Sequence, residues 1–124
     1  MGKIHKFKGK NGNFTWEGVA SKKYPDDRAK NVIKKEMIGP KDGAKNFEIR
    51  YFEVAPGGFT ALDSHEHDHG VLINRGKGKV LLNKELFEIG YGDAIYISPD
   101  EEHQFKNTGK EPLGFICVIP PKHK

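Results

Sequence analysis

Short runs of strand-forming residues recur along the chain from residue 47 onward, and turn residues separate them. The run 47–54 alternates aromatic or aliphatic residues with Glu48 and Arg50, which is the alternation of a strand. Pro56-Gly57-Gly58 predicts a turn after it. Further strands are predicted at 59–65, 71–74, 80–83, 86–89, 94–97, 103–106 and 113–119. Many short strands at intervals of about ten residues, with little helical periodicity, predict an all-β sandwich or barrel.

The first 45 residues give a weaker pattern. The segment 24–28 predicts a turn or one helical turn, and 31–38 is compatible with a strand or a short helix. We favour a strand over 31–38, because Val32 and Ile33 are β-branched and Gly39-Pro40 ends the segment.

These patterns predict three parts of one chain. We expect 1–45 to be an N-terminal extension that packs on the barrel or on a dimer partner, 46–120 to be the barrel, and 121–124 to be a tail. The strand 113–119 is apolar on both faces, so we expect it to be central in its sheet and covered on both sides. Coverage by a second copy of the chain predicts a homodimer.

Composition narrows the class of protein. The chain has 124 residues, 35% of them hydrophobic and 31% charged, which predicts a single domain. No apolar run approaches the ~18 residues of a membrane span, and no apolar segment follows the basic N-terminus, so we expect no signal peptide, no membrane partner and a cytoplasmic location. Cys117 is the single cysteine, which excludes an intramolecular disulfide and Cys-based zinc motifs; we expect it to be a small buried residue.

The formal net charge is +4, and the excess of lysine lies mainly in the first 35 residues and in 75–79. It lacks the interleaved aromatic residues of an RNA-binding surface, so we expect no nucleic-acid partner. The aromatic residues that we expect in the core, with one or two at a cavity mouth, are Phe52, Phe59, Tyr96 and Phe105.

Histidines supply the candidate chemistry. Three of the six lie within five residues, His65, His67 and His69, and Asp63 extends the series of alternate positions. A strand projects alternate side chains to one face, so at least two of these groups can point at one site. His103 begins a later strand and can lie across from them in a rolled-up sheet. Imidazole and carboxylate ligands together suit Mn, Fe, Ni, Zn or Cu.

Two spaced motifs carry a family resemblance. The first motif resembles the first signature of the cupin superfamily, G-x5-H-x-H-x3–4-E-x6-G. It consists of Gly57, five residues, Asp63-Ser-His65, three residues, His69, six residues and Gly76. The segment 92–107, with His103 at the histidine position, resembles the second signature, G-x5-P-x-G-x2-H-x3-N. The resemblance implies a cupin-type double-stranded β-helix, which is a jelly-roll barrel.

The same resemblance implies the metal ligands Asp63, His65, His69 and His103. Asp63 stands where the family usually has its first histidine, and His69 stands where it has glutamate. The ungapped register puts His67 in the turn between the two ligand strands. A hairpin shorter by two residues would instead make His65 and His67 the pair, but such a hairpin is hard to close.

The resemblance implies several possible reaction classes and does not select one of them. Cupins include dioxygenases, decarboxylases, isomerases and lyases, as well as non-catalytic binders. We expect one divalent transition metal ion and a small-molecule ligand, and we favour a metal-dependent enzyme acting on a small oxygenated organic molecule. The alternative is a non-catalytic binding or sensing cupin with a structural metal. The sequence identifies no catalytic residue.

Overall fold

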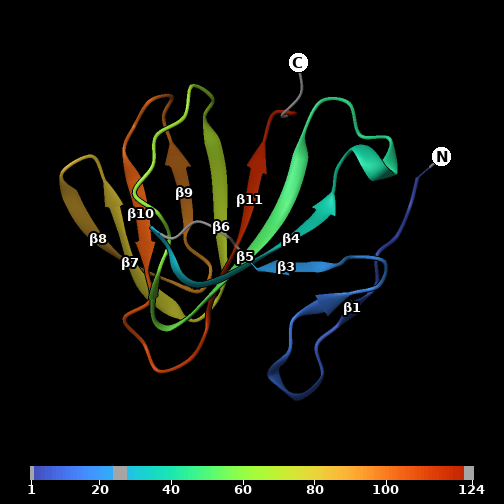
Figure 1. The fold of residues 1–124 in the computed structure, drawn as a ribbon, viewed down its shortest axis with the longest axis horizontal. Helices are drawn as coiled ribbons and strands as arrows, with labels where there is room; N and C mark the ends of the chain where they lie inside the picture. The colour runs from blue at the N-terminus through green and yellow to red at the C-terminus, as the bar shows by residue number, and fades with distance from the viewer. Residues whose placement is uncertain (1, 24–27, 122–124) are drawn as a thin grey trace.

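The computed structural model describes residues 2–23 and 28–121, and strands dominate it (Figure 1). The predicted turn at 24–28 and the predicted tail at 121–124 therefore lie largely outside the described residues. The elements are β1 (Phe7–Lys8), η1 (Lys10–Gly12), β2 (Thr15–Trp16), β3 (Ser21–Lys23), β4 (Lys30–Ile38), η2 (Pro40–Asp42), β5 (Glu48–Phe59), β6 (His69–Arg75), β7 (Lys77–Leu82), β8 (Glu85–Gly90), β9 (Ala94–Ile97), β10 (His103–Lys106) and β11 (Leu113–Ile119). The predicted all-β class is confirmed, and the segment 31–38 is a strand, as expected.

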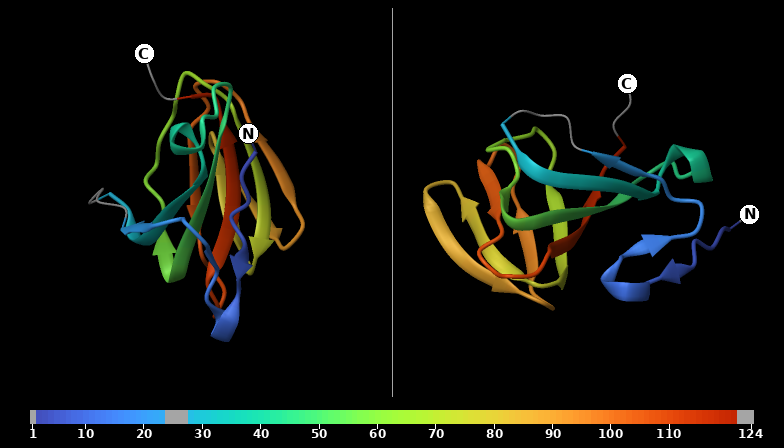
Figure 2. Two further views of the ribbon diagram at one scale, coloured as in Figure 1. Left: turned by 90° about the vertical axis from the view of Figure 1, so that its right-hand side faces the viewer. Right: turned by 60° about the horizontal axis from the view of Figure 1, so that its bottom comes forward.

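Nine of the described strands form one antiparallel sheet. Its main path runs β8-β7-β10-β5-β11-β6-β9, and β4 adds to the same sheet by pairing with both β3 and β5. The strands curl around an interior, and the separate hairpin of β1 and β2 lies to one side of them (Figures 1 and 2). Strands from distant parts of the sequence therefore face one space.

Apolar side chains from the curled sheet fill much of that interior. Phe105 and Phe115 stack with their ring centroids 4.2 Å apart, and Phe52 stacks on Phe115 at 5.3 Å. The buried core cluster comprises Val32, Val54, Val71, Ile73, Val80, Ile89, Ile97, Phe105, Leu113, Phe115, Cys117 and Ile119. Phe105 is in the core as expected, whereas the expectation for Tyr96 is wrong, since Tyr96 is 61% exposed on the outer side of β9.

The predicted turn at Pro56-Gly57-Gly58 is wrong, because β5 continues through it to Phe59. Val54 pairs with Val32 and Phe59 pairs with Lys30, so β5 carries extra residues opposite β4 and forms a bulge there. Gly57 adopts φ +80°, which is the left-handed conformation that such an irregularity favours. The glycines therefore bend a long strand instead of ending it.

The predicted strand at 59–65 is also wrong beyond Phe59. Residues 60–68 form a loop whose one β-bridge joins Asp63 to His103. Thr60 donates a backbone hydrogen bond to the Phe105 carbonyl, so the loop follows β10 without becoming a regular strand. The expectation that a strand projects the alternate residues 63, 65, 67 and 69 to one face is therefore wrong, because a loop carries the first three of them.

The two faces of β5 have unlike surroundings. Glu48 and Arg50 are buried, and Arg50 faces the interior of the sheet. On the outer face, the ring of Tyr51 lies 5.1 Å from that of Trp16 and 5.9 Å from that of Phe14, so the N-terminal segment covers it. Arg50 thus points inward, whereas Glu53 of the same strand contacts Tyr51 and Arg75 on the outer face.

The apolar strand β11 is central in the sheet, between β5 and β6, as expected. On its outer side Val118 is 41% exposed, and Leu72 on the neighbouring strand β6 is 47% exposed. The homodimer stays a prediction. None of the described segments forms a helix long and apolar enough to cross a membrane.

We predict that Gly58→Ala destabilises the bulge of β5. A Cβ at residue 58 would lie 2.5 Å from the Lys30 carbonyl oxygen and 2.9 Å from that of Ala55, and both are backbone atoms. We expect the free energy of unfolding to fall by about 1–3 kcal/mol in urea denaturation. Gly70→Ala is the matched control, because nothing lies within 4 Å of the added Cβ, and it should change stability by less than about 0.5 kcal/mol. Equal effects of the two substitutions would contradict the close approach.

Candidate metal centre

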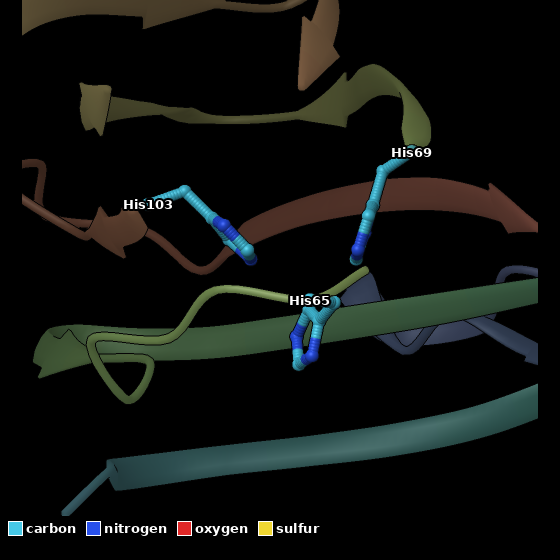
Figure 3. Close-up of side chains that lie close together, drawn as sticks. All are labelled: His65, His69 and His103. Carbon is cyan, nitrogen blue, oxygen red and sulfur yellow. The ribbon is translucent and has the colours of Figure 1, made fainter. Parts of the chain in front are cut away.

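Three histidines from three segments of the chain lie close together, and Figure 3 shows their rings side by side. His69 is the first residue of β6 and His103 is the first residue of β10, while His65 lies in the loop 60–68. One ring nitrogen of each lies within 4.8 Å of one ring nitrogen of each of the others. His69 and His103 are buried and His65 is half-buried. This spacing suits three ligands of one metal ion.

Backbone hydrogen bonds fix where these residues lie. Asp63 and His103 exchange two of them, with N–O distances of 3.1 Å and 2.9 Å. The Asp100 amide donates to the His65 carbonyl at 2.6 Å. The loop that carries His65 is therefore tied at two points to the chain around His103.

The ring nitrogens are arranged as a metal ion requires. His103 Nδ1 lies 2.9 Å from the Glu101 carbonyl oxygen, which only accepts, so Nδ1 carries the proton and Nε2 keeps its lone pair. His69 Nδ1 lies 3.3 Å from the Cys117 sulfur, and its Nε2 is buried without a hydrogen-bond partner. An orphaned imidazole nitrogen inside a cluster of histidines fits a metal ligand.

Burial favours the neutral form of two of these imidazoles, those of His69 and His65. Burial, together with the neighbouring rings of His103 and His65, lowers the pKa of His69 to about 3. The pKa of His65 is also lowered, first by burial and then by His103. Because metal ligation needs the neutral ring, both residues are in the required state near pH 7.

Asp63 and His67, the other two predicted site residues, border the same cavity. A carboxylate oxygen of Asp63 lies 3.5 Å from a guanidinium nitrogen of Arg28. The ring of His67 stacks 4.8 Å from that of His69 and 5.2 Å from that of His65. Neither residue belongs to the group whose ligand atoms lie within 4.8 Å, so ligation by Asp63 or His67 stays a prediction.

The histidines open into a cavity of about 230 Å³ inside the sheet. Charged and aromatic side chains share its wall. The lining residues are Val32, Lys34, Arg50, Phe52, Thr60, Ala61, Asp63, His65, His67, His69, Val71, His103, Phe105, Phe115, Cys117 and Ile119. The volume is suited to a small ligand beside a metal ion.

Sequence reasoning missed two cationic residues of this wall, Lys34 on β4 and Arg50 on β5. Their signal in the sequence is weak, because alternation along a strand does not say which face is inward. Cys117 is buried, as expected, but it also contacts both His69 and Arg50.

The comparisons with known proteins agree with this geometry. A family model described as "Cupin domain" matches residues 50–119. The chain is 31% identical over 108 residues to 1-methylthio-D-xylulose 5-phosphate methylsulfurylase of Rhodospirillum rubrum, a match that covers 86% of this chain and 69% of that protein.

Solved structures show the same fold. A cupin-2 domain from Rhodospirillum rubrum superposes with a TM-score of 0.82 at 29% identity, covering 90% of this chain and 76% of that one. The polyketide cyclase RemF from Streptomyces resistomycificus superposes with a TM-score of 0.76 at 29% identity, covering 83% and 74%. The predicted jelly-roll barrel is confirmed.

We predict that the metal-free protein loses stability as the pH falls below about 6.5, the ordinary pKa of histidine. Between pH 6.5 and about 3, the unfolded chain binds a proton at His69 that the folded chain does not bind, so stability rises with pH across this window. We expect His69→Gln to flatten the dependence of the melting temperature on pH between 7 and 5. Melting curves of the two proteins that shift in parallel would contradict the prediction.

We also predict how single alanine substitutions affect metal affinity. Replacing His65, His69 or His103 should weaken binding of Mn²⁺ and Zn²⁺ by orders of magnitude, because the backbone holds the remaining ligands in place. His67→Ala should cost at most the ~10–100-fold of a residue behind the ligands, and Asp63→Ala should fall between. Competition with a chromophoric chelator measures all five. Loss of binding in His67→Ala with retention in His69→Ala would show that the ligand set is wrong.

Proposed function

Because the chain belongs to the cupin family, we propose that it is a metal-dependent enzyme that acts on a small oxygenated organic molecule. The observation that carries the proposal is the group of three histidines beside a cavity of about 230 Å³. Three protein ligands are the usual set of a catalytic metal site, because they leave coordination positions for water and substrate.

In this proposal His65, His69 and His103 hold one divalent transition metal ion, and Asp63 is a candidate fourth ligand. The metal would polarise a carbonyl, enediol or carboxylate oxygen of the substrate and stabilise negative charge that develops on it. The contact of His103 with Glu101 and that of His69 with Cys117 keep the two rings oriented. Aromatic side chains of the cavity wall, such as Phe105 and Phe115, restrict the entry of water.

The similarity to proteins with enzymatic names supports catalysis over simple binding. One relative is named a methylsulfurylase and one structural neighbour a polyketide cyclase. Their reactions differ, so the shared feature that we carry over is catalysis in a cupin barrel, not a particular substrate.

The proposal predicts an exchangeable water on the bound metal and metal-dependent turnover. Loading the protein with Mn²⁺ should enhance water-proton relaxation beyond that of the free ion. Proton NMR of the loaded protein with a panel of sugar phosphates, hydroxyketones and 2-oxo acids should show conversion of at least one compound. The His103→Ala variant should lose both signals. A bound metal that has no exchangeable water and converts no compound would favour the binding or sensing module instead.

A further inference from the structure

Arg50 is a buried cation inside the candidate site. It is 9% exposed and is the third residue of β5, where the strand pairs with β4 on one side and β11 on the other. Its guanidinium lines the cavity that holds the three histidines. Charged side chains are almost never buried to this extent without an opposite charge.

The contacts of Arg50 do not supply such a charge. One guanidinium nitrogen lies 3.5 Å from the Cys117 sulfur, and the group lies 5.1 Å from the centroid of the Phe52 ring. Its Nε is buried and has no hydrogen-bond partner. Within the described ranges, no carboxylate comes within ion-pair distance of the group.

Among the described residues, the wall of the cavity also offers Arg50 no opposite charge. Asp63 is the one carboxylate among the lining residues, and it faces Arg28. A divalent ion held by three neutral histidines would add two positive charges to the same space. An anionic ligand is the simplest group that balances this charge and gives Nε of Arg50 an acceptor.

Arg50 and the histidines lie close enough for one small molecule to reach both. The Cys117 sulfur lies 3.3 Å from His69 Nδ1 and 3.5 Å from the Arg50 nitrogen, so a single atom separates the guanidinium from a ligand ring. The cavity of about 230 Å³ corresponds to roughly seven or eight water volumes. A molecule of a few carbon atoms therefore fills it.

We propose that Arg50 binds a carboxylate of the substrate while a neighbouring carbonyl or hydroxyl oxygen of the same molecule binds the metal. This inference rests on the proposed function and names its substrate class as small 2-oxo or 2-hydroxy acids. A carboxylate is the anion that we favour, because the unpartnered Nε lies on an edge of the guanidinium that matches two carboxylate oxygens, and the cavity of about 230 Å³ is suited to a molecule of a few carbon atoms.

Pyruvate and methyl pyruvate test the proposal, because the ester keeps the ketone and the methyl group but lacks the charge. Each probe is titrated into Mn²⁺-loaded protein, and broadening of its methyl proton resonance by the bound Mn²⁺ is measured. We expect pyruvate to bind about tenfold or more tightly than methyl pyruvate. In Arg50→Gln this preference should vanish, and in Arg50→Lys it should be reduced.

The controls separate this inference from the proposed function. Arg75→Gln alters an arginine that pairs with Glu53 outside the cavity, and it should keep the preference. If Mn²⁺ does not bind, the proposed function fails. If Mn²⁺ binds but the wild-type protein does not distinguish the two probes, the carboxylate inference alone is overturned. Stronger displacement of pyruvate by inorganic phosphate than by acetate would overturn the choice of a carboxylate.

The stability of the metal-free variants distinguishes a ligand-binding role of Arg50 from a structural one. If Arg50 serves to bind a ligand, its guanidinium is a buried charge without an opposite charge in the ligand-free protein, and such a charge is destabilising. Arg50→Gln should therefore melt at the wild-type temperature or above it. A marked fall in the melting temperature of both Arg50→Gln and Arg50→Lys would assign Arg50 to the fold and overturn the inference.

Discussion

The pair of backbone hydrogen bonds between Asp63 and His103 is the constraint on which the candidate site depends. It ties an irregular loop to the first residue of β10, and so sets the distance between His65 and His103. His69 follows from the sheet itself, since it pairs with Ile97 and a short turn joins Ile97 to His103. Backbone contacts therefore set the positions of all three residues, and the Glu101 carbonyl and the Cys117 sulfur orient two of the rings.

Burial in the curled sheet favours the neutral form of His65 and His69. The pKa of His69 is lowered mainly because its ring is removed from water, and the other rings oppose its charge as well. The apolar rings of Phe105 and Phe115 in the same wall help to exclude water. The side chains that form the core therefore also exclude water from the histidines. Core packing and the suitability of the site for a metal ion thus depend on the same residues.

Sequence patterns predicted several strands after residue 47 and the histidines of the site, but they did not predict which face of each strand points inward. The strands at 94–97, 103–106 and 113–119 were predicted with the bounds that the structure has, because turn residues flank them. The bulge of β5 was missed, since it depends on Lys30, a partner distant in sequence. Arg50 was missed as a site residue because alternation is the same whichever face points inward. The spacing of the histidines brought His65, His69 and His103 together, although a loop and not a strand carries His65.

Arg50 also bears on how the sheet tolerates a charged site. Its backbone lies between Glu36 of β4 and Cys117 of β11 in register, on the strand with neighbours along most of both edges. Removing the guanidinium from water costs free energy that the hydrogen bonds and packing of this central strand offset. A low-dielectric wall in turn strengthens the attraction of the buried cation for any anion that enters. Burial of Arg50 therefore has two effects. It costs the fold free energy, and it strengthens the preference of the site for charged over neutral ligands.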